Sequence, residues 1–300
     1  MASATGTEKF LAQGPVAFAR THPIVPDGGL ALNDADVAEH FPGEKRHEIK
    51  VPHRLRMATI TKNHNATSDK NLAYLLTHQR YRPGHPIAAD SFLTWYLPWN
   101  PGGGQVNMSI PIDPVLGPEG GPENVNPPFF FTAELTGCSV FVRGDPRAPE
   151  IFHAGAQNPS WQGSAGTHWR TLFAKSRPLT FEQDRFVEVN KYDYIGGDVL
   201  GARYTPPLVK AYVERIEAEE KLRDANCEIL GFAGFGCVFG HRDTIGHWAF
   251  YLQENVRIFY RRPATPKPYA CANRALRLSQ IYPHRAVVAT NDAPKPLPFP

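Results

Sequence analysis

Residues 129–155, FFFTAELTGCSVFVRGDPRAPEIFHAG, carry the strongest strand signal in this chain of 300 residues. Aromatic and β-branched residues fill its apolar runs, and RGDPRAPE supplies turn residues between the last two runs. The pattern predicts one strand and then a hairpin, with Cys138 beginning a hairpin strand and His153 on the strand that returns beside it. An antiparallel ladder brings distant residues to within about 5 Å of each other. The separation of Cys138 and His153 in sequence therefore does not prevent contact.

More strands are expected on both sides of this hairpin. SFLTWYLPW precedes it, and FVEVNKYDYIGG, CEILGFAGFGCVFG, HWAFYLQ and VRIFYRR follow it. Residues 206–226, PPLVKAYVERIEAEEKLRDAN, combine two initial prolines with an apolar stripe and predict the clearest helix. A second helix is expected in TSDKNLAYLLTHQRY, residues 67–81, where Thr67 or Ser68 can cap the first turn.

Proline and glycine are common in the chain and set its general architecture. With 29 prolines and 25 glycines, short strands joined by structured loops are favoured over long helices. We expect an irregular N-terminal arm at 1–35, a long binding or gating loop at 100–128 and a Pro-rich tail at 291–300. The fold class that follows is α+β, with one domain over 36–290. Its predicted core is a mainly antiparallel, β-sandwich-like sheet arrangement with flanking helices.

Charge and hydropathy exclude several classes of protein. The net charge is only +3, and the basic residues are scattered among acidic ones, so we expect no nucleic-acid partner. No run approaches the roughly 18 apolar residues that span a bilayer, and the N-terminus has no apolar signal core. We therefore expect no membrane span, synthesis in the cytoplasm and, for a secreted or injected protein, a route without a classical signal peptide. Four cysteines are too few for a disulfide scaffold and indicate free thiols.

Cys138 and His153 are the candidate catalytic residues. A cysteine attacks as the thiolate, and a nearby histidine can accept its proton and later protonate a leaving group. Gly137 allows the backbone to pass close to a substrate, and amide groups near Gly137 and Cys138 could face an oxyanion. Such a site needs a third group that orients the imidazole. Thr132 is the candidate, through its hydroxyl or its carbonyl.

These residues resemble a known family. The glutamine deamidase toxins share a pattern of Thr, then Leu-Ser-Gly-Cys, then His. The similar residues in this chain are Thr132, the run Leu135-Thr136-Gly137-Cys138 and His153. That family includes the cytotoxic necrotizing factors and Burkholderia lethal factor, and the chemotaxis deamidase CheD is similar in using Cys, His and Thr on a related fold. The match covers roughly residues 132–155. Thr136 replaces the more typical serine, which preserves a hydroxyl.

The resemblance implies an α/β fold built around a β-sandwich and the activity of a hydrolase. Cys138 would attack the carboxamide carbon of a protein glutamine, and His153 would protonate the departing ammonia and then activate water to release glutamate. The change replaces a neutral donor and acceptor by a charged acceptor. The implied protein is a virulence toxin or effector whose partner is a target protein with a reactive glutamine. No cofactor is implied.

Other interpretations stay open. The same cysteine and histidine could serve a peptidase or another amidase, or the chain could be a non-catalytic, β-rich binding module whose 101–128 loop forms the interface. In such a module, both side chains would be structural residues that are fully buried or point apart. Cys237, His241 and His247 are residue types that ligate zinc, but their spacing fits no standard site, and we predict no metal. PGGGQ lacks the Lys-Ser/Thr of a phosphate loop, so we assign no nucleotide.

Overall fold

The computed structural model describes the chain at 5–26, 48–50, 55–62, 73–81, 86–99, 104–112, 115–116, 124–155, 169, 186–194, 207–266 and 268–283. Its helices are α1 (Gly6–Gln13), α2 (Pro15–Thr21), α5 (Lys191–Tyr194) and α6 (Pro207–Lys221). The strands are β1 (Ile24–Pro26), β2 (Glu48–Lys50), β3 (Leu55–Lys62), β4 (Tyr74–Arg80), β5 (Phe92–Leu97), β6 (Gln105–Ser109), β7 (Val115–Leu116), β8 (Asn124–Val125), β9 (Phe129–Thr132), β10 (Ser139–Asp145), β11 (Ala148–Ala154), β12 (Phe186–Val189), β13 (Glu228–Arg242), β14 (Trp248–Arg261) and β15 (Tyr269–Tyr282). The predicted α+β class is confirmed.

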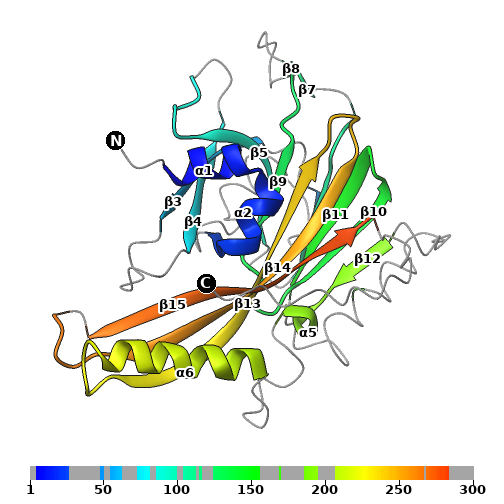
Figure 1. Ribbon diagram of the computed structural model, residues 1–300. Helices are drawn as coiled ribbons and strands as arrows, with labels where there is room; N and C mark the ends of the chain where they lie inside the picture. Colours follow the sequence, from blue (N-terminus) through cyan, green and yellow to red (C-terminus); the bar gives the residue numbers. More distant parts are fainter. Residues whose placement is uncertain are drawn as a thin grey trace, which may run out of the picture.

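Two sheets form the body of the molecule (Figure 1). The larger sheet has eight strands in the order β1-β4-β3-β5-β9-β13-β14-β15, and the smaller has five in the order β12-β10-β11-β6-β2. Most neighbouring strands are antiparallel, whereas β1 with β4, β5 with β9 and β2 with β6 are parallel. The main core lies between the two sheets, because Val106, Val140 and Ile151 of the smaller sheet share one buried cluster with Trp95 and Val238 of the larger. The expected β-sandwich-like core is present.

The N-terminal residues 5–26 are ordered helices and a strand, so the expectation of an irregular arm is wrong there. Thr5 and Glu8 form a capping box at the start of α1. Phe10 of α1 and Phe18 of α2 are fully buried in a second cluster on the other face of the larger sheet. Burial of these rings against the sheet explains why a Gly- and Ala-rich segment is held in place.

The prediction of a helix at 67–81 is also wrong for the residues of this range that the structure describes. Residues 74–80 form β4, which pairs with β3 on one side and β1 on the other. Tyr74 and Leu76 are buried at the two-residue spacing of a strand. Two neighbouring strands thus offer this segment backbone partners and apolar contacts that outweigh its helical spacing.

The long loop expected at 100–128 contains a core strand. β6 lies between β11 and β2, and Val106 and Met108 are fully buried. β7 and β8 form a separate short pair within the same range. An interface made by the whole of this loop is therefore excluded.

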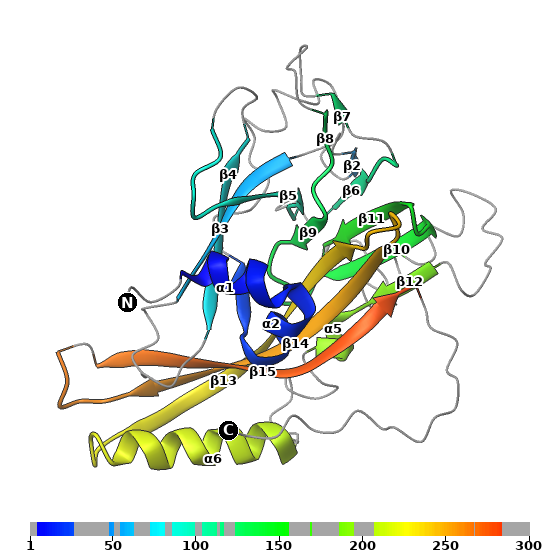
Figure 2. The same cartoon turned by 45° about the horizontal axis from the view of Figure 1, so that its top comes forward.

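The long strands β13, β14 and β15 run across the molecule from an end covered by α6 to the smaller sheet (Figures 1 and 2). Val209, Tyr212 and Ile216 of α6 pack on Val256 and Ile258 of β14. The predicted helix at 206–226 is present as α6, which ends earlier than expected, at Lys221, and the strand predicted at 227–240 is β13. HWAFYLQ and VRIFYRR belong to one strand, β14. β15 is not among the strands that the sequence predicts. None of the described helices has the length and apolar character to cross a membrane.

Candidate active site

The predicted hairpin of β10 and β11 is present and sets the geometry of the candidate site. Val140 of β10 lies directly opposite His153 of β11, and Ser139 lies opposite Ala154. Cys138 stands one residue before β10 rather than at its first position. His153 is on the returning strand, as predicted.

Strand alternation places Cys138 and His153 on the same face of the hairpin. Directly opposite residues share a face, so Val140 and His153 point the same way, and Cys138 lies two residues before Val140. This makes Cys138 the diagonal neighbour of His153, a relation that separates α-carbons by about 7–8 Å and lets long side chains interact. Val140 and Cys138 both belong to the core layer between the sheets. The two candidate residues therefore face the same core layer.

The imidazole of His153 is fully buried. None of its surface is exposed, and burial lowers its pKa to about 4, while the backbone of Leu97 acts in the opposite direction. Neither ring nitrogen makes a hydrogen bond of standard geometry within the described part of the chain, so the Leu97 contact is a loose one. The imidazole is neutral at pH 7, which is the form that can accept a proton from a thiol.

Thr132, the expected third group, makes different contacts. Its hydroxyl lies 3.0 Å from the carbonyl oxygen of Ala133 and 3.3 Å from that of Val238, and it donates to these backbone groups. The group that favours a charged imidazole is the backbone of Leu97, the register neighbour of Thr132 in the β5–β9 ladder. Sequence reasoning missed Leu97 because a main-chain group carries no residue-type signal.

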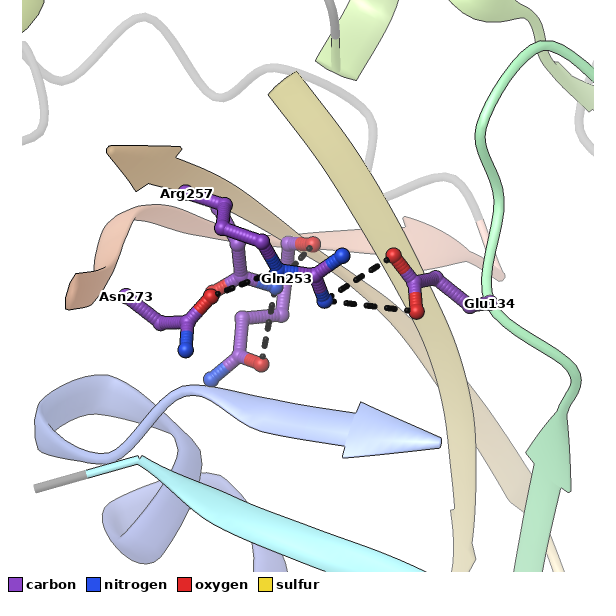
Figure 3. A network of polar contacts seen from close by, with 5 residues as sticks. Glu134, Gln253, Arg257 and Asn273 are labelled. Atoms are coloured by element: carbon purple, nitrogen blue, oxygen red, sulfur yellow. Dashed lines mark hydrogen bonds and ion pairs between the residues drawn. The ribbon is translucent and has the colours of Figure 1, made fainter. Parts of the chain in front are cut away.

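Residues 133–138, the strap, connect β9 to β10 and carry the candidate nucleophile. Leu135 and Gly236 of β13 exchange two backbone hydrogen bonds of 2.9 Å each. Next to this bridge, the carboxylate of Glu134 lies 3.3 Å from the guanidinium of Arg257, which also donates to the Asn273 side chain at 3.0 Å. Figure 3 shows Arg257 between these two partners. The start of the strap is therefore fixed to the larger sheet.

The end of the strap is the more accessible part of the candidate site. Thr136 is exposed, and Gly137 and Cys138 are half-buried. Gly137 has a positive φ of 157° and lies directly before the candidate nucleophile, where the oxyanion-binding amides were expected. Cys138 is therefore the more exposed of the two candidate residues, since His153 has no exposed surface.

Tyr194 is a site residue that sequence reasoning missed. Its hydroxyl donates a 2.6 Å hydrogen bond to the carbonyl oxygen of Cys138. Burial raises the pKa of Tyr194 well above its usual value, and a nearby Cys138 thiolate would raise it further. α5 is capped by Asp193, whose carboxylate accepts the backbone N–H of Asn190 at 2.8 Å. The sequence predicts that the run NKYDY continues a strand, so it did not indicate that Tyr194 would contact Cys138.

The other cysteines occupy different surroundings. All four cysteines are free of disulfides, as predicted. Cys237 is fully buried, and burial raises the pKa of its thiol far above its usual value. Cys271 is half-buried on β15, and burial raises its pKa as well. His241, named above beside Cys237, stacks on Phe129 with ring centroids 5.8 Å apart.

The chain matches no protein-family model and no curated protein in sequence comparisons.

Proposed function

We propose that this protein is a cysteine-dependent protein glutamine deamidase. The observation that carries the proposal is the hairpin register, which makes Cys138 the diagonal neighbour of His153 on one face. A half-buried thiol beside a neutral imidazole has the elements of a nucleophile and its base. The resemblance of LTGC and the downstream histidine to the deamidase toxins supplies the substrate class.

The proposed reaction uses the thiol of Cys138 and the imidazole of His153, which face the same core layer. His153 accepts the thiol proton of Cys138, and the sulfur attacks the carboxamide carbon of a target glutamine. The carbon–nitrogen bond breaks, and the imidazolium returns the proton to the departing ammonia, which leaves a thioester. His153 then takes a proton from water, the hydroxide attacks the thioester, and the sulfur leaves and is reprotonated. The product is glutamate, and the protein would act as an effector delivered to another cell.

Leu97 supports the charged intermediate of this sequence. Burial alone opposes formation of the imidazolium, since the charged form loses its hydration. The Leu97 backbone raises the pKa of His153 and so offsets part of that cost. In this proposal it takes the orienting role for which Thr132 was the candidate.

A binding module is the second candidate, and one observation favours it. His153 has no exposed surface, as expected for a structural histidine in a core. In that case Cys138 is a half-buried packing residue, and its replacement leaves the function of the protein unchanged. A peptidase with the same two residues differs in its product, because it cleaves the target chain and leaves glutamine side chains intact.

The deciding experiment is mass spectrometry of a host-cell protein extract incubated with the wild-type protein, Cys138→Ser or Cys271→Ser. Cys271 is the matched control because it is also a half-buried free thiol but lies on β15. We expect glutamine-to-glutamate conversion with wild type and Cys271→Ser and none with Cys138→Ser. Conversion by Cys138→Ser, or no conversion by any of the three, contradicts the proposal. Cleaved peptides instead select the peptidase.

A further inference from the structure

The carbonyl of the candidate nucleophile is held by a side chain from another element. The Tyr194 hydroxyl at the end of α5 donates to the Cys138 carbonyl at 2.6 Å. Only 3% of Tyr194 is exposed, and its ring belongs to the core cluster against which Cys138 packs. A buried phenol with one short hydrogen bond to the backbone defines a single position for that carbonyl.

Gly236 makes room for this tyrosine. A β-carbon at Gly236 would lie 3.0 Å from Cγ of Tyr194 and 3.3 Å from its Cβ, which is closer than ordinary contacts. The backbone of the same glycine also exchanges two hydrogen bonds with Leu135. Gly236 of β13 therefore supports the strap at two points. It bonds Leu135 directly, and it gives room to the Tyr194 ring that holds Cys138.

We propose that Tyr194, seated on Gly236, is a positioning residue that fixes the main chain of the nucleophile Cys138. This inference rests on the proposed function, in which Cys138 attacks a carboxamide. The Leu135 bridge and the Tyr194 hydrogen bond restrain the strap on both sides of Gly137. The backbone of Gly137 also hydrogen-bonds the Tyr194 phenol, so the amide of Cys138 is the donor that is oriented before a substrate binds. Preorganised donors are those that stabilise an oxyanion most effectively.

The protonation state of Tyr194 suits this role. Because its pKa is raised, the phenol stays protonated across the neutral range and donates a hydrogen bond. It does not act as a base on the thiol. Its contribution is the geometry of the Cys138 backbone, and the proton transfers remain with His153.

Tyr194→Phe tests the inference because it removes the hydroxyl and keeps the ring on Gly236. Loss of one hydrogen bond that fixes the nucleophile is expected to lower kcat about tenfold, with KM unchanged. The substrate is the target protein that wild type modifies in the extract. Tyr212→Phe is the matched control, since Tyr212 is also buried and its hydroxyl bonds a backbone carbonyl, that of Asn273, at 3.5 Å.

A second readout does not depend on deamidation. The alkylation rate of Cys138 by iodoacetamide, followed at that peptide by mass spectrometry across pH, reports the position and environment of the thiol. We expect an altered rate or pH profile in Tyr194→Phe and a wild-type profile in Tyr212→Phe. Gly236→Ala is expected to act like Tyr194→Phe, and the double variant to lose no more than the stronger single variant, because both changes disturb one contact.

The outcomes separate this inference from the proposed function. If wild type deamidates a target and Tyr194→Phe keeps both its kcat and its alkylation profile, the positioning role is overturned and the function stands. If wild type deamidates nothing, the proposed function fails. The Tyr194→Phe alkylation profile still decides whether the tyrosine positions the thiol. Equal effects of Tyr194→Phe and Tyr212→Phe would indicate a general loss of stability and would also overturn the inference.

Discussion

At the scale of residues, the candidate base and nucleophile have opposite environments. His153 is fully buried and neutral, whereas Cys138 is half-buried at the end of the strap. Burial keeps the imidazole neutral, and its lowered pKa makes it a weaker base than an exposed histidine; the ring also has no surface that a substrate could contact. The chemistry must therefore reach the target through sulfur, and His153 acts behind it.

The low pKa of His153 predicts how stability depends on pH. The folded-state value of about 4 lies below the ordinary 6.5, so the unfolded chain binds more protons between these values. The contribution of neutral His153 to the free energy of unfolding is complete above about pH 6.5 and is lost as the pH falls toward 4. This change is on the order of 3 kcal/mol. Urea unfolding of wild type and His153→Gln across this range should give a weaker pH dependence in the variant.

The half-buried His241 provides the control, because burial lowers its pKa without removing it from solvent. His241→Gln is expected to change the pH dependence less than His153→Gln does. An unchanged dependence in His153→Gln contradicts the buried neutral state. A wild-type stability that rises as the pH falls through this range would instead indicate an imidazolium already paired with the Cys138 thiolate.

The part of the site that depends on side chains within one hairpin could be predicted from sequence. The turn residues after Arg143 and the flanking strand patterns are local, so the hairpin and the relation of Cys138 to His153 follow from them. Leu97 and Tyr194 could not be predicted in the same way. Leu97 acts through its backbone, and Tyr194 reaches the strap from 56 positions away along the chain.

At the scale of elements, the strap depends on a charge pair that fixes it to β14. Glu134 and Arg257 are both largely shielded from solvent, with 16% and 25% of their side chains exposed. Burial raises the pKa of Glu134, and Arg257 counteracts this effect. The guanidinium also lies over the Phe235 ring, 4.7 Å from its centroid. Removal of Arg257 would leave a shielded carboxylate without its cation.

Arg257→Ala is therefore expected to lower the free energy of unfolding by about 2 kcal/mol. The control is Arg261→Ala, since Arg261 lies on the same strand as Arg257 and pairs with Glu228 of β13, but these two side chains are 44% and 54% exposed. An exposed pair contributes about 0–1 kcal/mol. Chemical denaturation of both variants measures the difference, and equal losses would show that the Glu134 pair does not anchor the strap.

Helices and strands could be predicted where their own residues determine the conformation. They could not be predicted where pairing with neighbouring strands determines it. Two prolines precede an apolar stripe at the start of α6, and its predicted start agrees with the structure, although the helix ends at Lys221 rather than at Asn226. β4 has helical spacing but lies between β1 and β3, and β6 has glycines before it and prolines after it but completes the smaller sheet. In both cases pairing with distant strands determines the conformation, and such pairing leaves little trace in a local pattern.

At the scale of the whole molecule, Gln253 joins the N-terminal helices to the larger sheet. Its side-chain amide donates to the carbonyls of Ala19 at 2.6 Å and His22 at 2.8 Å, and its oxygen accepts the N–H of Ile24 at 2.9 Å. Gln253 is fully buried, so these three backbone groups have their bonds away from water. Figure 3 shows Gln253 beside the chain of α2 and β1. The side-chain amide of Asn255 also donates to the side-chain oxygen of Gln253 at 3.2 Å.

Gln253→Leu preserves most of the volume and removes all three hydrogen bonds. Buried backbone groups left without partners cost about 1–3 kcal/mol each, so we expect a loss of at least about 3 kcal/mol in the free energy of unfolding. Limited proteolysis should also cut the variant within 5–26 before the rest of the chain. Gln280→Leu is the control, because that half-buried side chain makes a single 3.3 Å bond to Pro283. Wild-type protection of 5–26 in Gln253→Leu would contradict the joining role.

The absence of a side chain at Gly236 limits how far the sequences of proteins that share this fold can diverge. A substitution at 236 would displace the Tyr194 ring, so this position tolerates little change although it lies in β13, outside the strap. Position 97 is under a weaker constraint, because its backbone group does not depend on the identity of the side chain, and a buried apolar residue that keeps the strand and the core preserves it. A signature for recognising distant relatives should therefore require glycine at 236 and tyrosine at 194, together with Cys138 and His153. At position 97 it should require only an apolar residue.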